Sequence, residues 1–220
     1  MAGEELQRIR IKYAKQKSIR FIGHLDMLRA WERTLRRADL PVAFTQGFHP
    51  HARINLGAAL PLGFTSSWEL VEVWLEKGVA IGDLEQMLQA ALPPGIAILA
   101  IEVIDNLAPK LQKQIVSAEY EVTFKSPSLL NDMRGRIDEL LAQENHPRTR
   151  RGKTYDLRPL VEKLTLEENR DGITLRMRLT VGEGNTGRPD EVILALEEDP
   201  LSVLIHRSRL IFRDSSPGNN

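Results

Sequence analysis

The chain has 220 residues, 42% of them hydrophobic and 27% charged, and 30 lysines and arginines balance 30 aspartates and glutamates. These values are ordinary for a folded protein with a core. Because cysteine is absent, disulfides, zinc–thiolate sites, iron–sulfur clusters and thiol nucleophiles within the chain are excluded. The first residues are acidic where a signal peptide is basic, and no apolar run approaches the roughly 20 residues that span a bilayer. We therefore expect a cytoplasmic protein without membrane contact.

The neutral total hides an uneven distribution of charge. Residues 1–53 contain eleven basic and five acidic residues, together with three of the five histidines, whereas residues 53–106 are predominantly acidic. The local potential, rather than the net charge, attracts a charged ligand. The first quarter of the chain is therefore the part expected to meet a polyanion.

The first predicted element is a strand at residues 7–13. Ile9, Ile11 and Tyr13 alternate with three basic residues, a period of two that places the two sets on opposite faces. We therefore predict a half-buried strand whose outer face is basic. The basic residues are Arg8, Arg10 and Lys12.

A helix is predicted over residues 25–38. Its apolar side chains recur at helical spacing, and the rest of its surface carries four arginines. Either His24 or Asp26 is expected to cap its first turn. The four arginines are Arg29, Arg33, Arg36 and Arg37.

The elements that follow complete a first module and then repeat the order. Residues 53–56, 69–75 and 96–103 are predicted strands, residues 81–91 a helix, and residues 106–114 a linker. The second half is predicted as strand 118–124, helix 128–141, a hairpin of 161–166 with 173–181, a short helix from Pro189 and a strand at 201–212. This pattern predicts an α+β protein of two tandem ferredoxin-like (βαββαβ) modules, residues 1–115 and 116–213, with a disordered tail at 214–220.

The first candidate site is the start of the arginine-bearing helix. His24 precedes helix N–H groups that attract anions, and Asp26 could orient it for acid–base work. The alternative is structural, with Asp26 pairing Arg29 one turn on. Guanidinium groups grip phosphate oxygens in pairs, so the four arginines favour a polyanion, against the alternative of an ordinary solvated helix face.

The second candidate site is the segment 46–53, Gln-Gly-Phe-His-Pro-His-Ala-Arg. An aromatic ring between polar groups is typical of a loop that stacks an RNA base and reads its edge. Two alternatives stay open, namely a metal held by the histidines, which lack a nearby third ligand, and a rigid loop whose aromatic ring fills the core. The candidate side chains are Gln46, Phe48, His49, His51 and Arg53. A basic segment at 148–153 was a weaker candidate for the same surface.

Several ordered motifs resemble one known family. Residues 20–26 (RFIGHLD), the arginine helix, residues 46–51 (QGFHPH), 59–63 (ALPLG) and 153–159 (KTYDLRP) are similar to motifs of the radical SAM-linked protein family. That family is a bacterial domain of unknown function, found alone or attached to the C-terminus of a radical SAM protein. The resemblance covers about residues 8–213 and implies partnership with a radical SAM enzyme.

Three functions follow from these observations. The leading hypothesis is a non-catalytic accessory protein, without cofactor or metal, that binds tRNA or ribosomal RNA for modification or ribosome-linked processing beside a radical SAM enzyme. Its RNA contacts would be the basic strand face, the start and arginines of the helix, and the 46–53 segment. The alternatives are a docking adaptor for that enzyme that touches no nucleic acid, and a metal-independent RNA-processing enzyme that uses a histidine.

Overall fold

The computed structural model of the protein describes residues 6–125, 130–169, 172–182 and 186–213. The chain divides into two compact units, Met1–Gln114 and Ile115–Asn220. Each unit mixes helices with antiparallel strands, so the predicted α+β class is confirmed. The tail predicted to be disordered, residues 214–220, lies outside the described residues.

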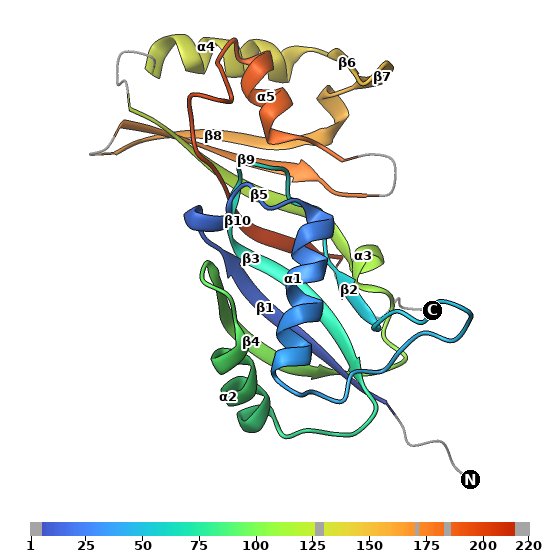
Figure 1. Cartoon of the computed structure of the whole chain (residues 1–220). Helices are drawn as coiled ribbons and strands as arrows, with labels where there is room; N and C mark the ends of the chain where they lie inside the picture. Colours follow the sequence, from blue (N-terminus) through green and yellow to red (C-terminus); the bar gives the residue numbers. More distant parts are fainter. Residues whose placement is uncertain (1–5, 126–129, 170–171, 183–185, 214–220) are drawn as a thin grey trace, which may run out of the picture. The chain divides into compact units, whose positions relative to one another are not determined.

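The first unit is an antiparallel sheet with its two longest helices on one face (Figure 1). Its strands lie in the order β4-β1-β3-β2. The elements are β1 (Gln7–Lys15), the 3₁₀ helix η1 (Lys17–Ile19), α1 (His24–Arg37), β2 (Ile54–Leu56), β3 (Thr65–Leu75), α2 (Ile81–Ala91), β4 (Ile96–Ile104) and α3 (Leu111–Gln114).

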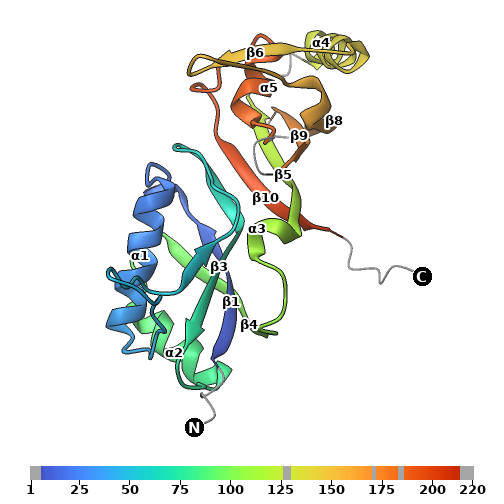
Figure 2. The ribbon, with the colours of Figure 1, turned by 90° about the vertical axis from the view of Figure 1, so that its right-hand side faces the viewer.

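The core of this unit lies between the sheet and the helices α1 and α2, which Figure 2 shows on the same side of the sheet. The inward positions of β1, Ile9 and Ile11, are fully buried as predicted. Tyr13 meets Trp31 of α1 edge to face, with ring centroids 5.0 Å apart, a favoured aromatic geometry. This packing fixes α1, and with it the arginines on its outer surface.

Two predictions for the first unit need correction. Helix α1 begins at His24, and its N-cap is Gly23, so neither His24 nor Asp26 caps the helix through its side chain. The predicted linker at 106–114 contains the helical turn α3, whose Leu111 is fully buried. An isolated apolar residue in a polar segment therefore anchors that segment to the first unit.

The second unit has the element order of the first with an additional two-stranded hairpin after its first helix. Its strands lie in the order β10-β5-β9-β8, all antiparallel. The elements are β5 (Ile115–Phe124), α4 (Leu130–Ala142), β6 (Pro147–Arg150), β7 (Lys153–Asp156), the 3₁₀ helix η3 (Arg158–Leu160), β8 (Val161–Asn169), β9 (Gly172–Thr180), α5 (Pro189–Ala195) and β10 (Ile205–Phe212).

The basic segment of the second unit is a two-stranded hairpin, β6–β7. Arg151 and Gly152 connect the strands, and both have positive φ, 49° and 75°, which is the conformation that a tight hairpin connection requires. The helix predicted to open at Pro189 is confirmed, with Pro189 in its first turn. The last strand, β10, begins at Ile205, later than predicted.

Candidate functional site

The arginines of α1 have unequal freedom. Arg29 pairs with Asp26 at 3.2 Å, as the structural alternative predicts. Arg37 donates through Nε to the carbonyl oxygen of Ala91 at 3.1 Å, which ties α1 to the end of α2. Arg33 and Arg36 are exposed, and neither forms an ion pair with a residue that the structure describes. Of the four arginines predicted to contact phosphates, only Arg33 and Arg36 are therefore exposed and not engaged by another described residue.

The basic face predicted for β1 is wrong for two of its three residues. Arg8 and Arg10 are buried, and both pair with the fully buried Glu72 of β3, at 2.7 Å and 2.8 Å. Arg8 also donates to the carbonyl oxygens of Ala108 (2.7 Å) and Pro109 (3.0 Å). Because a buried charge must be compensated, these guanidinium groups serve the fold and cannot meet a phosphate backbone.

The other basic side chains on this face of the sheet form cation–π contacts with tryptophan rings. The ammonium of Lys12 lies 3.1 Å from the ring centroid of Trp68. Trp74 contacts two guanidinium groups, those of Arg8 and Arg53, at 5.1 Å and 5.0 Å. Such contacts are favourable cation–π pairs. Arg53 is half-buried as a result, and the continuous basic platform expected from the sequence does not form.

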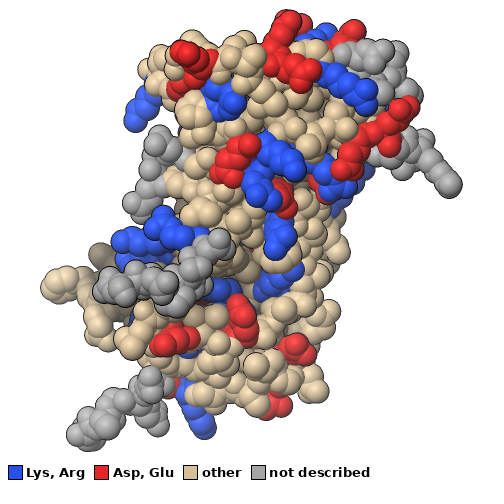
Figure 3. Space-filling model, turned by 180° about the vertical axis from the view of Figure 1, so that it is seen from behind, with Lys and Arg blue, Asp and Glu red and all other residues tan. Residues whose placement is uncertain are grey.

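The space-filling view of the side opposite Figure 1 agrees in part with this account. In Figure 3 the basic side chains in the upper part of the view lie next to acidic ones, whereas a basic group at the left has no acidic neighbour in this view. In the second unit Arg178 of β9 pairs with Glu119 of β5 at 2.6 Å, and Arg176 pairs with Glu121 and Glu167. Hydrogen bonding to Glu167 raises the pKa of Arg176 further above its ordinary value. Basic residues of both sheets are thus largely paired.

The segment 44–52 forms a hairpin-like projection. Phe44 and Ala52 bridge its base, the N–H of Thr45 donates to the carbonyl oxygen of His51 at 2.8 Å, and the N–H of His51 donates to Oγ1 of Thr45 at 3.0 Å. Phe48 stands near the tip with its ring fully exposed. The alternative in which this ring fills the core is therefore wrong.

A groove of about 530 Å³ separates this projection from α1. We call it the α1 groove. Its lining is mainly apolar, with three charged residues from α1 and its end. The apolar residues are Leu35, Leu40, Pro41, Val42, Phe44, Pro50, Ala52 and Ile54, and the charged ones are Glu32, Arg36 and Asp39, beside His51.

The α1 groove brings together only two of the predicted site residues, Arg36 and His51. Gln46 and Arg53 line a separate hollow of about 410 Å³. His49 is exposed without lining either hollow. The predicted residues therefore do not converge on one basic concavity, and carboxylates stand beside the arginine that reaches the groove.

Sequence reasoning missed a buried polar cluster at the start of α1. His24 lines a hollow of about 20 Å³ together with Tyr13, Lys15 and Glu69. Lys15 is buried and donates to the carbonyl oxygens of Arg20 (3.0 Å) and Ile22 (2.8 Å). The sequence contains a signal for this burial, because Lys15 lies on the same face of β1 as the buried Ile9, Ile11 and Tyr13. The hollow holds at most about one water molecule, and Lys15 fixes the turn before α1.

The basic hairpin of the second unit is also ion-paired. Arg148 and Arg150 lie 3.0 Å and 3.8 Å from the carboxylate of Glu191 in α5. Burial, and then the negative charge of Glu191, raises the pKa of the neighbouring Tyr155 above its ordinary value. The hairpin is therefore attached to α5 through Arg148 and Arg150, whereas Arg151 and Lys153 are exposed and form no ion pair with the described residues.

Within the described ranges, no group of three or more histidine, aspartate or glutamate side chains is placed to hold a metal ion. None of the helices in those ranges has the length and apolar character needed to cross a membrane.

Comparisons with known proteins identify the family. No curated protein matches the chain. Among solved structures, one of a protein proposed to be a glycine cleavage system transcriptional repressor is similar at 10% identity, with 96% of this chain and 99% of that chain covered. Its TM-score of 0.26 is too low to carry an argument. A family model described as an uncharacterized protein conserved in bacteria matches residues 8–189. The chain therefore belongs to this conserved bacterial family, DUF2344.

Proposed function

We propose that this protein is a docking adaptor without catalytic activity, and that its first unit binds an apolar segment of a partner protein in the α1 groove. The observation that carries the proposal is the lining of that groove, where eight apolar residues surround one arginine and two carboxylates. Grooves of this kind, apolar with a few charged groups at the rim, are typical of peptide recognition.

The charges of the groove favour a protein over a polyanion. Glu32 and Asp39 flank Arg36, so a phosphate backbone that approached Arg36 would also meet two like charges. The buried pairing of Arg8 and Arg10 with Glu72 removes further cations from the surface. A polypeptide with apolar anchors and charges of both signs fits this mixture better than RNA does.

The partner that we propose is a radical SAM enzyme, as the resemblance of the sequence motifs implies. Such an enzyme binds its cluster through cysteine thiolates, and this chain contains no cysteine. The chemistry would therefore belong to the partner, while this chain would position it or its substrate.

The experiment is a binding measurement between the purified protein and a radical SAM protein of its source organism, after nuclease treatment. Phe44 lines the groove and is half-exposed, so Phe44→Ser should weaken binding by about tenfold, as loss of an aromatic anchor does. Leu107→Ser is the matched control, because Leu107 is almost fully exposed and lies outside the groove. Equal affinity of the F44S and wild-type proteins would reject the groove as the docking site.

RNA binding is the second candidate, and one observation favours it. Arg33, Arg36 and the ring of Phe48 are exposed and project from α1 and from the 44–52 segment. Arginines hold phosphates while an aromatic ring stacks a base. If this candidate holds, Arg33→Ala with Arg36→Ala weakens tRNA binding, and the affinity falls steeply with salt. Arg134→Ala, which removes an exposed arginine of α4, is the control; salt-independent binding would reject the candidate.

We further propose that each unit is a ferredoxin-like module. The support is the sheet order. In the first unit β1 lies between β3 and β4, and β3 also pairs β2. In the second unit, when the separate hairpin β6–β7 is not counted, the first strand β5 likewise lies between the third and fourth strands, β9 and β10, and β9 also pairs β8. An adaptor of this architecture has two units on which to present binding surfaces.

A further inference from the structure

Strand β4 lies at one edge of the sheet of the first unit (Figure 1). Among the described residues it pairs with β1 alone. Its other edge therefore presents a row of backbone N–H and C=O groups without strand partners. Such an edge is a template on which a further strand can pair.

The sequence of β4, IAILAIEVI, does little to discourage such pairing. Proteins blunt exposed edges with lysine, proline or a bulge. Neither lysine nor proline occurs in β4, and nine residues make it a long edge. One bulge is present, since Lys12 faces Ala100 and Tyr13 faces Ile98, which leaves Leu99 between them without an opposite residue. Leu99 is half-exposed.

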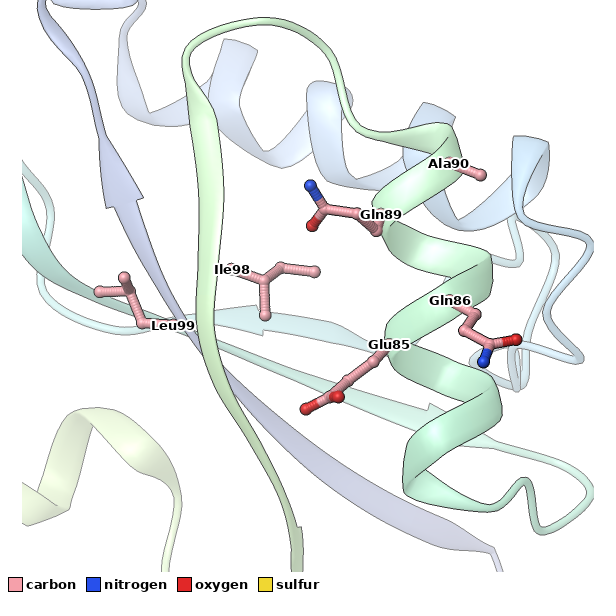
Figure 4. A pocket seen from close by; sticks show the side chains of 6 residues that line it. All are labelled: Glu85, Gln86, Gln89, Ala90, Ile98 and Leu99. Atoms are coloured by element: carbon pink, nitrogen blue, oxygen red, sulfur yellow. The ribbon is translucent and has the colours of Figure 1, made fainter.

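A hollow of about 650 Å³ runs between β4 and helix α2. Figure 4 shows Glu85 and Gln89 reaching from α2 toward β4, Ile98 facing the helix, and Leu99 pointing away from it. A strand added beside β4 alternates its side chains between these two surroundings. The side chains on one face of the added strand would meet the carboxylate of Glu85 and the amide of Gln89, and those on the other face would meet Leu99.

The negative charge of α2 and β4 indicates which kind of segment can pair with the β4 edge. Helix α2 and β4 contain Asp83, Glu85 and Glu102 but neither lysine nor arginine. Glu102 lies 3.5 Å from Arg10, whereas Glu85 has no ion-pair partner in the part of the chain that the structure describes. A second copy of the chain pairing through β4 would bring the same acidic residues against these. A basic segment would compensate them.

We infer that β4 accepts an extended segment of a partner protein as an additional strand, and that this segment alternates lysine or arginine with apolar residues. Backbone hydrogen bonds to the β4 edge provide the affinity, as in other strand additions. Glu85 pairs with the basic side chains on the α2 side, and Leu99 packs against the apolar ones. The β4 edge is separate from the α1 groove and does not depend on the function proposed for it.

The test uses short synthetic peptides and the full chain. A peptide of alternating lysine and valine should bind, and one of alternating glutamate and valine should not. Two N-methylated versions of the lysine peptide are then compared. In one version the backbone nitrogens along one edge of the extended peptide are methylated and cannot donate hydrogen bonds, and in the other version those along the opposite edge are methylated. One of these two peptides should lose binding by more than tenfold. If both bind as well as the parent peptide, strand addition is overturned.

Variants then locate the site. Glu85→Lys should weaken the lysine peptide by roughly two- to fivefold, the range for an exposed pair, and should improve the glutamate peptide. Glu139→Lys, the same change at an exposed position of α4, should alter neither. Phe44→Ser should also leave peptide binding unchanged, which separates this site from the α1 groove. Sedimentation that shows a dimer dissociated by the lysine peptide would overturn the proposal, because a second copy would then occupy the edge.

Discussion

The two units place arginine–glutamate pairs at equivalent positions, on their two central strands, but with different exposure. In the first unit Arg10 lies opposite Glu72, and Glu72 is fully buried. In the second unit Arg178 lies opposite Glu119, and about 29% of the Glu119 side chain is exposed. The same kind of cross-strand ion pair is thus buried in the first unit and partly exposed in the second unit.

The segment after β4 causes the difference. Arg8 donates to the carbonyl oxygens of Asp105 and Ala108, at 3.2 Å and 2.7 Å, and Arg10 donates to Oε1 of Gln114 at 3.1 Å. Residues 105–114 therefore cover this part of the sheet and satisfy its guanidinium groups. The covering segment, and not the charge pattern of a strand, therefore decides whether a basic face is available to a ligand.

The largest expected effect comes from removing the buried carboxylate. Glu72→Gln leaves the buried Arg8 without a compensating charge among the described residues and leaves Arg10 with the exposed Glu102, 3.5 Å away. The free energy of unfolding of the first unit should therefore fall by about 3–5 kcal/mol. Denaturant unfolding followed by tryptophan fluorescence measures it, because Trp31, Trp68 and Trp74 all belong to this unit.

The equivalent change in the second unit is the control. Glu119→Gln removes a partly exposed partner and should cost no more than about 1 kcal/mol, measured by unfolding followed by circular dichroism. Equal losses in the free energy of unfolding for the two variants would contradict the conclusion that the ion pair is buried in the first unit and partly exposed in the second.

A smaller effect is expected when the covering segment is loosened. Leu111→Ala removes a fully buried side chain and should destabilise the first unit by about 2–4 kcal/mol. Hydrogen exchange of residues 105–114 should rise at the same time. Leu107→Ala, at an almost fully exposed leucine of the same segment, should change neither quantity. An unaltered exchange rate in L111A would show that Leu111 does not hold the cover in place.

The smallest effect concerns pH and the second unit. Burial and the charge of Glu191 raise the pKa of Tyr155, so the folded state holds this proton more tightly than the unfolded state, in which the pKa is about 10. The contribution is complete below that pH and is lost as the pH rises through the folded-state value. Unfolding free energy should therefore decline less steeply above about pH 10 in Tyr155→Phe than in the wild type. Parallel curves would contradict the raised pKa.

Sequence periodicity located most of the fold but little of the site. The alternation of Ile9, Ile11 and Tyr13 identifies β1, and the spacing in α2 matches the helix at Ile81–Ala91. A period of two distinguishes two faces of a strand and contains no information on which face a distant segment covers. The burial of Arg8 under residues 105–110 therefore could not be predicted.

The same limit applies to α1. Its four arginines share one helix and are equivalent in the sequence pattern, yet Arg37 is held by the carbonyl oxygen of Ala91, fifty-four residues away. Such a contact depends on how α1 and α2 pack together, which propensity does not encode. The exposure of Phe48 likewise follows from the hairpin of 44–52 and not from its composition.

The buried triplet of Arg8, Arg10 and Glu72 also restricts how this protein can evolve. Loss of Glu72 removes the carboxylate that both arginines share, and loss of either arginine removes hydrogen-bond donors from a fully buried carboxylate, so each single replacement passes through a destabilised intermediate. We expect related chains either to keep all three identities or to exchange them together for neutral side chains of similar volume. Drift at these positions would thus be concerted, whereas the exposed partners in the other half of the molecule can vary one at a time.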